Sequence, residues 1–213
     1  MVLGITILIF AIIIGINWWL GSWNVLINLI NFYISALVAS SYFEIAADQI
    51  ETANRTLTYL ADFIALWAIF FLTFIVIRAI TDLLSKFKMN LPMWLEYTLR
   101  SVFALWLAIG FLCFAMFSLH LAPIPPTAFQ VDVQDSTMGF GPDRMWMAFV
   151  QSRSRGALAE SKNAMFVGEY DLQDHPDDAD LGARVFDPYA QFIPNYHTRR
   201  ATLSTIEALR VNK

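Results

Sequence analysis

Charged residues are missing from the start of this chain: Met1 to Phe43 contain no Asp, Glu, Lys, Arg or His. A water-soluble helix of that length needs a polar face, so this segment must lie in lipid or inside protein. No Lys or Arg occurs before Arg55, so the basic start of a cleaved signal peptide is lacking. We expect the N-terminal segment to stay in the membrane.

Cysteine is also scarce: Cys113 is the single one, which excludes an intramolecular disulfide. The sequence has neither a glycine-rich phosphate loop nor a G-x-S-x-G nucleophile motif. The acidic run from Asp171 to Asp180 lacks the central Gly and terminal Glu of a helix-loop-helix calcium site. Apart from Arg199-Arg200 there is no basic run, which argues against a nucleic-acid partner. These absences predict a protein that is not an enzyme and holds neither cofactor nor metal.

Four apolar stretches are what the sequence does contain, at residues 1–20, 25–43, 59–80 and 101–122. A helix rises about 1.5 Å per residue, so roughly 20 apolar residues cover the ~30 Å hydrocarbon core of a bilayer. Only residues 21–24 join the first two stretches, which predicts a tight helical hairpin. The predicted fold class is an all-α membrane protein, with four transmembrane helices in a domain of residues 1–122.

Residues 123–213 form the second predicted domain, a polar and partly ordered tail with short helices outside the membrane. Prolines within residues 123–126 end the fourth helix. Pro142 and Asp143 predict the start of a short helix, and another is predicted over residues 198–211. One face of the first of these helices is apolar and comprises Trp146, Phe149 and Val150. We expect this face to dock on the membrane surface or on a partner.

The orientation in the membrane follows from the basic residues of the connections. The third connection and its edges carry Arg78, Lys86, Lys88 and Arg100, whereas the second connection has only Arg55. Short loops rich in Lys and Arg stay cytoplasmic. With four spans, both termini are then predicted on the outer side, which is the periplasm in a bacterium.

A polar stripe runs along the second stretch, formed by Asn24, Asn28, Asn31 and Ser35 at helical spacing. Buried amides in hydrocarbon need partners, so the stripe is interpreted as a packing face toward another helix or a second subunit. The alternative is that it lines the pathway of a small channel or transporter.

Several residues are predicted to lie at the membrane boundary. Trp18, Trp19 and Trp23 surround the first turn, where indole rings favour the headgroup level. Arg78 lies near the end of the third stretch and can reach the interface or pair with Asp82, one helical turn later. His120, at the end of the fourth stretch, is expected to be an interfacial residue and not a ligand.

At the Leu20-Gly21 turn and along residues 34–43 the chain resembles the colicin V production protein (CvpA) family of bacterial inner-membrane proteins. That family has four spans and a very short first loop that usually bears an Arg-Gly pair, of which this chain keeps only Gly21. Its second helix commonly ends in a small-residue and aromatic patch like residues 36–43 here. In place of the Asp and Gly that often precede the fourth helix of the family, this chain has residues 90–96, Asn-Leu-Pro-Met-Trp-Leu-Glu.

The resemblance covers about residues 1–122 and leaves the tail as an extension outside the family pattern. It implies a non-enzymatic accessory protein of the bacterial inner (plasma) membrane. The family is linked to production or export of a peptide toxin, colicin V, and to envelope maintenance. The partners that it implies are the lipid bilayer together with either further copies of the chain or a larger envelope complex.

Overall fold

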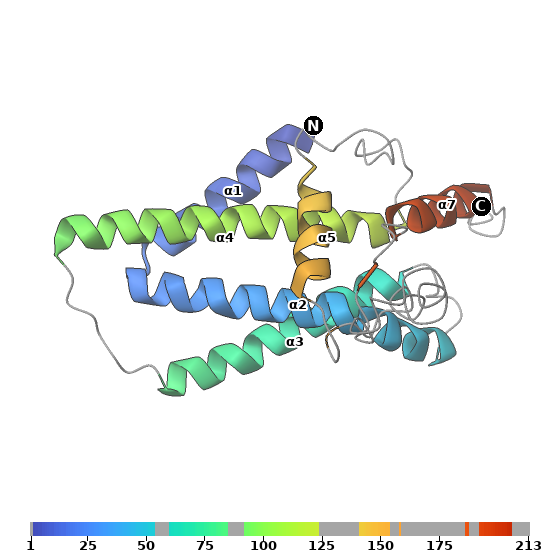
Figure 1. Cartoon of the computed structure of the whole chain (residues 1–213), viewed down its shortest axis with the longest axis horizontal. Helices are drawn as coiled ribbons and strands as arrows, with labels where there is room; N and C mark the ends of the chain where they lie inside the picture. The colour runs from blue at the N-terminus through green and yellow to red at the C-terminus, as the bar shows by residue number, and fades with distance from the viewer. Residues whose placement is uncertain are drawn as a thin grey trace, which may run out of the picture.

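The computed structural model describes residues 2–53, 60–84, 92–123, 141–153, 158, 186–187 and 192–205, and within these ranges it is all-helical with no strands. The helices, in chain order, are α1 (Val2–Trp18), α2 (Ser22–Ala53), α3 (Ala61–Leu84), α4 (Met93–Leu121), α5 (Pro142–Arg153) and α7 (Phe192–Thr205). The first four lie roughly along one long axis, and α5 crosses that axis (Figure 1).

Three of these helices, α2, α3 and α4, are long and apolar enough to cross a membrane. All three extend beyond the predicted stretches, and α2 and α4 do so by the most. Helix α2 continues past Phe43 to Ala53, because the following residues are mainly Ala, Glu, Gln and Ile, which tolerate or favour a helix. Helix α4 already begins at Met93, directly after Pro92, whose fixed φ suits the residue before a helix.

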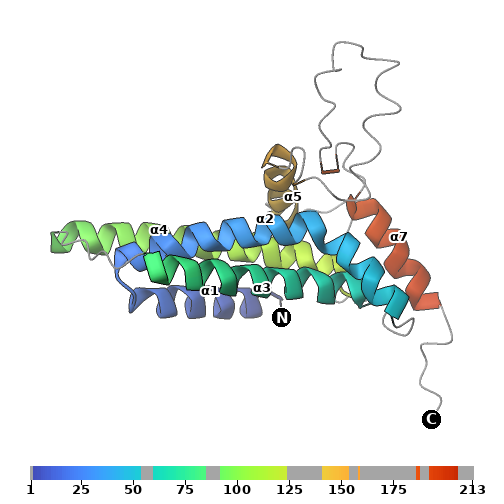
Figure 2. The same ribbon diagram turned by 90° about the horizontal axis from the view of Figure 1, so that it is seen from below.

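Helix α1 is shorter, with 17 residues, and its packing differs from the predicted hairpin. The chain does reverse within the few residues between Trp18 and Ser22, but α1 packs mainly on α4 and not on α2. Figure 2 shows α1 on the side of the bundle that is opposite to α5. The reason is a clamp from α4: Glu96 accepts hydrogen bonds from the backbone N–H and the hydroxyl of Ser22, at 2.7 and 2.6 Å. Arg100 donates to the carbonyl oxygen of Trp18 at 3.0 Å. Both ends of the turn are thereby held by α4.

Helix α2 is the centre of the bundle and packs on both α3 and α4. Its buried side has small residues between bulky ones, so the neighbouring helices can approach closely. These residues are Phe32, Ala36, Ala39 and Phe43. On α4, a Cβ added at Gly110 would lie 2.6 Å from the hydroxyl oxygen of Tyr33. Glycine at this position therefore lets the Tyr33 ring cross α4.

The two tail helices pack on the bundle. The predicted start of a helix at Pro142 is confirmed. The apolar face of α5 was expected to meet the membrane or a partner, but Trp146 and Val150 are buried against the helices of the same chain. Helix α7 begins at Phe192, earlier than the predicted residue 198, because the carboxylate of Asp187 accepts a hydrogen bond from the N–H of Phe192 and so caps the helix start. The predicted residues 206–211 lie outside the described residues.

Candidate functional site

The candidate site lies at the end of the bundle where α7 packs, called here the α7 end, and its centre is a buried pair between α4 and α5. Nε2 of His120 lies 2.9 Å from Oδ2 of Asp143, and the two side chains are 0% and 2% exposed. His120 was expected to be an interfacial residue; the structure shows that it is fully buried under α5. Burial by itself would raise the pKa of Asp143, but the hydrogen bond and charge of His120 and nearby backbone N–H groups outweigh it and lower that pKa.

A second bond between α5 and the bundle comes from Trp146. Its indole Nε1–H donates to the hydroxyl of Ser40 on α2 at 3.1 Å, and both residues are buried. The Trp146 ring lies 5.3 Å from the ring of Phe114 in an edge-to-face arrangement and is stacked on Tyr33. An indole with its N–H bonded and its faces packed is stable in an apolar interior. The histidine pair and the tryptophan together fix the position of α5.

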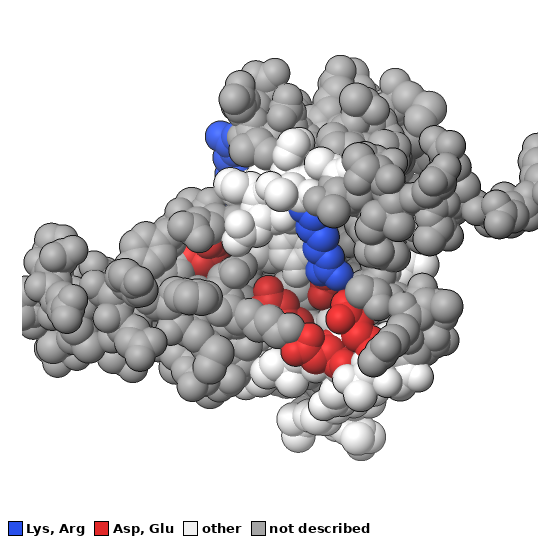
Figure 3. Space-filling view, turned by 90° about the vertical axis from the view of Figure 1, so that its right-hand side faces the viewer, with Lys and Arg blue, Asp and Glu red and all other residues white. Residues whose placement is uncertain are grey.

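Helix α7 is held by a third set of contacts, centred on Arg199. Its guanidinium donates to Asp62 at the start of α3 and lies 3.4 Å from a carboxylate oxygen of Glu51 on α2. Burial would lower the pKa of Arg199, but Asp62 and Glu51 raise it, so the cation stays charged. Burial and the carboxylates of Asp62 and Glu44 hold the pKa of Tyr196 well above its usual value. Figure 3 looks onto this end and shows the basic side chain beside a group of acidic ones.

The predicted polar stripe of α2 lies toward the opposite end of the bundle, called here the turn end because it contains the α1–α2 turn. Asn31 is fully buried and its amide donates to Thr81 on α3 at 3.0 Å. Asn28 accepts from Arg78 at 2.6 Å. Ser35 is buried, whereas Asn24 is exposed in the first turn of α2. The structure therefore places three of the four stripe residues against other helices of the same chain.

The predicted boundary residues also lie at the turn end. Arg78 pairs with Asp82 at 2.9 Å, as expected from their spacing. Trp19 is 90% exposed and Trp18 44% exposed, and Trp23 is partly buried. Glu96 and Arg100, which hold the α1–α2 turn, were not predicted as structural residues. Their spacing of four along one helix was the signal available, because such pairs interact on a helix surface.

Cavities are present toward both ends of the described part of the bundle. One of about 390 Å³ lies between α5 and α7, and its polar lining residues are Arg144, Gln151 and Asp187. The other, of about 250 Å³, is lined by α1, α2, α3 and α4 near the turn end, and its lining is mainly apolar apart from Asn17 and Asn28. Within the described ranges, no group of three or more His, Cys, Asp or Glu side chains could hold a metal ion. The polar contacts at the α7 end therefore connect helices of the chain to one another.

Comparison of the chain with protein-family models, with curated proteins and with solved structures finds no match. The class of the protein therefore rests on its own architecture. Three long apolar helices, with polar contacts concentrated toward the two ends of the bundle, fit a protein embedded in a membrane.

Proposed function

We propose that this chain is a non-enzymatic accessory protein of a bacterial inner membrane that serves an export or envelope process, as the resemblance to the colicin V production protein family implies. The observation that carries the proposal is the way in which α5 and α7 are bound. Both helices are joined to the bundle by polar contacts, through Asp143 and Arg199. A cap that is bonded to the end of a membrane anchor is the arrangement that an assembly subunit needs.

In this proposal α1 is a fourth span. Its 17 residues are apolar except for Thr6 and Asn17, and a helix of that length covers about 26 Å, close to the ~30 Å hydrocarbon core. The basic turn end then faces the cytoplasm, and the α7 end and both termini face the periplasm. A reporter that is active only in the cytoplasm, fused after Lys213, should be silent in this topology. Activity of that fusion would contradict it.

The alternative is a small channel or transporter whose pathway follows the polar stripe. The contacts of the stripe support the accessory role more strongly, because Asn28 is bonded to Arg78 and Asn31 to Thr81. A pathway would need both amides to face a water-filled space. Asn28 lines the cavity of about 250 Å³, but that cavity is lined mainly by apolar side chains, and Asn31 is fully buried.

One experiment distinguishes the two functions. The chain is crosslinked in native membranes and recovered through a tag, and in parallel it is reconstituted in vesicles for ion and solute flux. The accessory role predicts recovery of one membrane or envelope protein in constant ratio, with flux no greater than in empty vesicles. Flux that disappears on replacing Asn28 and Asn31 by Leu would establish the alternative. Recovery of the chain without any other protein would contradict the accessory role.

A further inference from the structure

Helix α5 lies crosswise to the spanning helices, and its contacts with α4 show at which depth along the spanning helices it lies. The turn end is marked by Arg100 and Trp18, a charged and an aromatic residue of the kind found at a membrane boundary. From Arg100, a hydrocarbon core of ~30 Å extends along roughly 20 residues of α4 and reaches the level of His120. Helix α5 contacts α4 at His120 and, about 9 Å deeper, at Phe114. It therefore lies at the far boundary of the apolar core.

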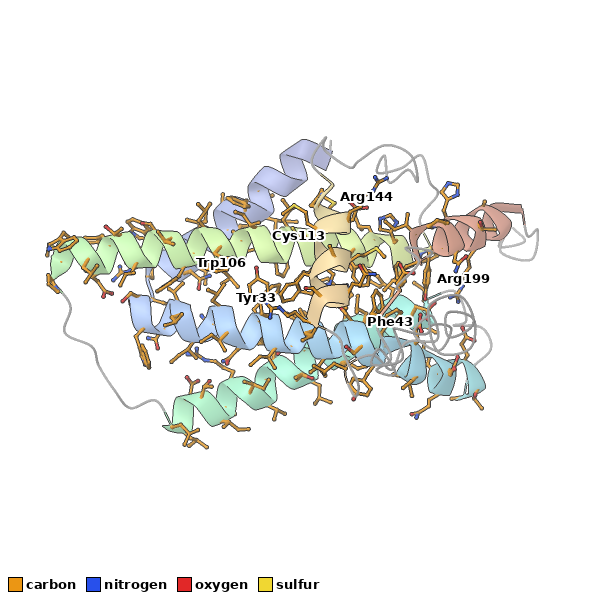
Figure 4. All side chains as sticks on the ribbon, in the orientation of Figure 1. Tyr33, Phe43, Trp106, Cys113, Arg144 and Arg199 are labelled. Carbon is orange, nitrogen blue, oxygen red and sulfur yellow. The ribbon has the colours of Figure 1, made fainter. Side chains whose placement is uncertain are left out.

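The side chains of α5 divide into three faces. The first faces the bundle and comprises Asp143, Trp146 and Val150, all of which are buried. The second faces α7 and includes Arg144, Ala148 and Gln151, which line the cavity between the two helices. Figure 4 shows Arg144 on the side of α5 that is nearer the α7 end, and Tyr33 and Trp106 on the other side.

The third face points toward the turn end and carries two apolar side chains, with Ser152 and Arg153 beside them in the last turn of the helix. Met145 is 52% exposed, and Phe149, one turn later, contacts the ring of Tyr33 at 5.3 Å. Tyr33 lies on α2 on the turn-end side of Ser40, which binds Trp146. Met145 and Phe149 are therefore directed along the membrane normal toward the hydrocarbon core, and Arg144 and Gln151 are directed away from it. This is the side-chain pattern of a helix that lies in a membrane interface.

We infer that α5 is an interfacial helix that contacts the phospholipids of the leaflet at the α7 end: Met145 and Phe149 meet acyl chains, and Arg144 and Gln151 lie at the headgroup level. The chemistry of the two faces matches this partner. Transfer of thioether and phenyl groups from water to hydrocarbon is favourable, and a guanidinium pairs favourably with lipid phosphate. The inference requires no particular orientation of the bundle across the membrane, so its failure would leave the proposed topology and function untouched.

The test is a pair of cysteine variants on opposite faces of α5. Met145→Cys and Ala148→Cys are made in a Cys113→Ala background, reconstituted in phosphatidylglycerol–phosphatidylethanolamine vesicles and spin-labelled. Both sites are exposed, so neither substitution removes a buried contact. Collision rates with oxygen, which concentrates in lipid, and with a water-soluble nickel chelate give an accessibility ratio for each label. Leu105→Cys on α4 and Gln49→Cys on α2 are the hydrocarbon and water references.

We expect the oxygen-to-nickel accessibility ratio of Met145→Cys to be close to that of the hydrocarbon reference, Leu105→Cys. The ratio of Ala148→Cys should be close to that of the water reference, Gln49→Cys. Equal ratios at the two α5 sites, or the reverse order, would overturn the inference. Poor access of both reagents to Met145→Cys would also overturn it, because the face would then be covered by protein. A lipid-soluble carbene probe on the unsubstituted chain provides a second measurement, and it should modify Met145 or Phe149 but not Ala148.

Discussion

Removing the histidine from the buried pair should cost more than any other change at the site. His120→Ala leaves the Asp143 carboxylate 2% exposed and without the side chain that bonds it. Breaking a buried pair from one side typically costs about 3–5 kcal/mol, because an uncompensated charge remains buried. Asp143→Asn keeps the shape and a hydrogen-bonding oxygen and leaves no buried carboxylate, so its cost should be roughly 0.5–1.5 kcal/mol, the net worth of one hydrogen bond.

The measurement is unfolding of the purified chain in mixed micelles with increasing denaturing detergent, followed by tryptophan fluorescence. Trp146 lies one turn from Asp143 on α5 and reports the release of that helix. His197→Ala, on the partly exposed surface of α7, is the matched control and should change the free energy of unfolding by no more than about 0.5 kcal/mol. Equal costs for His120→Ala and Asp143→Asn, both below about 1 kcal/mol, would refute the reasoning.

Three further predictions use the same assay. Gly110→Ala should destabilise the chain by about 1–3 kcal/mol, because the new methyl group would overlap the Tyr33 side chain. Gly15→Ala, where an added Cβ has no atom within 4 Å, should stabilise the chain by about 0.4–1 kcal/mol. Equal effects of the two substitutions would contradict the close approach of Tyr33 to Gly110. Asn31→Leu should cost about 0.6–1 kcal/mol, the usual worth of an interhelical hydrogen bond in a membrane, and a stabilised variant would show that the bond to α3 contributes nothing. Because the pKa of Asp143 lies below the ordinary value of 3.8, its contribution to stability should be complete above that pH and should be lost as the pH falls through the lowered pKa. The Asp143→Asn variant should not show this loss, and identical acid transitions of the two proteins would argue against the pairing.

Much of the membrane part was predictable because hydrophobic length is a local property. The stretches at residues 25–43, 59–80 and 101–122 correspond to α2, α3 and α4. The helix start at Pro142 was also predictable, because proline in the first turn has a fixed φ and needs no N–H partner. Helix ends in polar sequence were less predictable, since there the apolar signal fades. This explains why α2 and α4 extend beyond the predicted stretches.

The candidate site was predictable only in part. Arg78 and Asp82 are four residues apart on one helix, so their pair could be expected from spacing. The burial of His120 could not be predicted, because its partner, Asp143, lies 23 residues along the chain on another helix. The contact of Arg199 with Asp62 spans 137 residues. No periodicity within one segment reports such distant pairs.

By itself, the sequence determined which segments are apolar and long enough to enter a membrane, where short helices begin, and how basic residues are distributed among the connections. Each of these depends on a run of neighbouring residues and on the solvent around it. The tertiary structure alone decided that α1 lies along α4, that α5 crosses the bundle over His120, and that Arg199 joins α7 to the starts and ends of spanning helices. These features depend on which helix surfaces fit together and on the cost of leaving a buried charge without a partner, and both are properties of the packed chain.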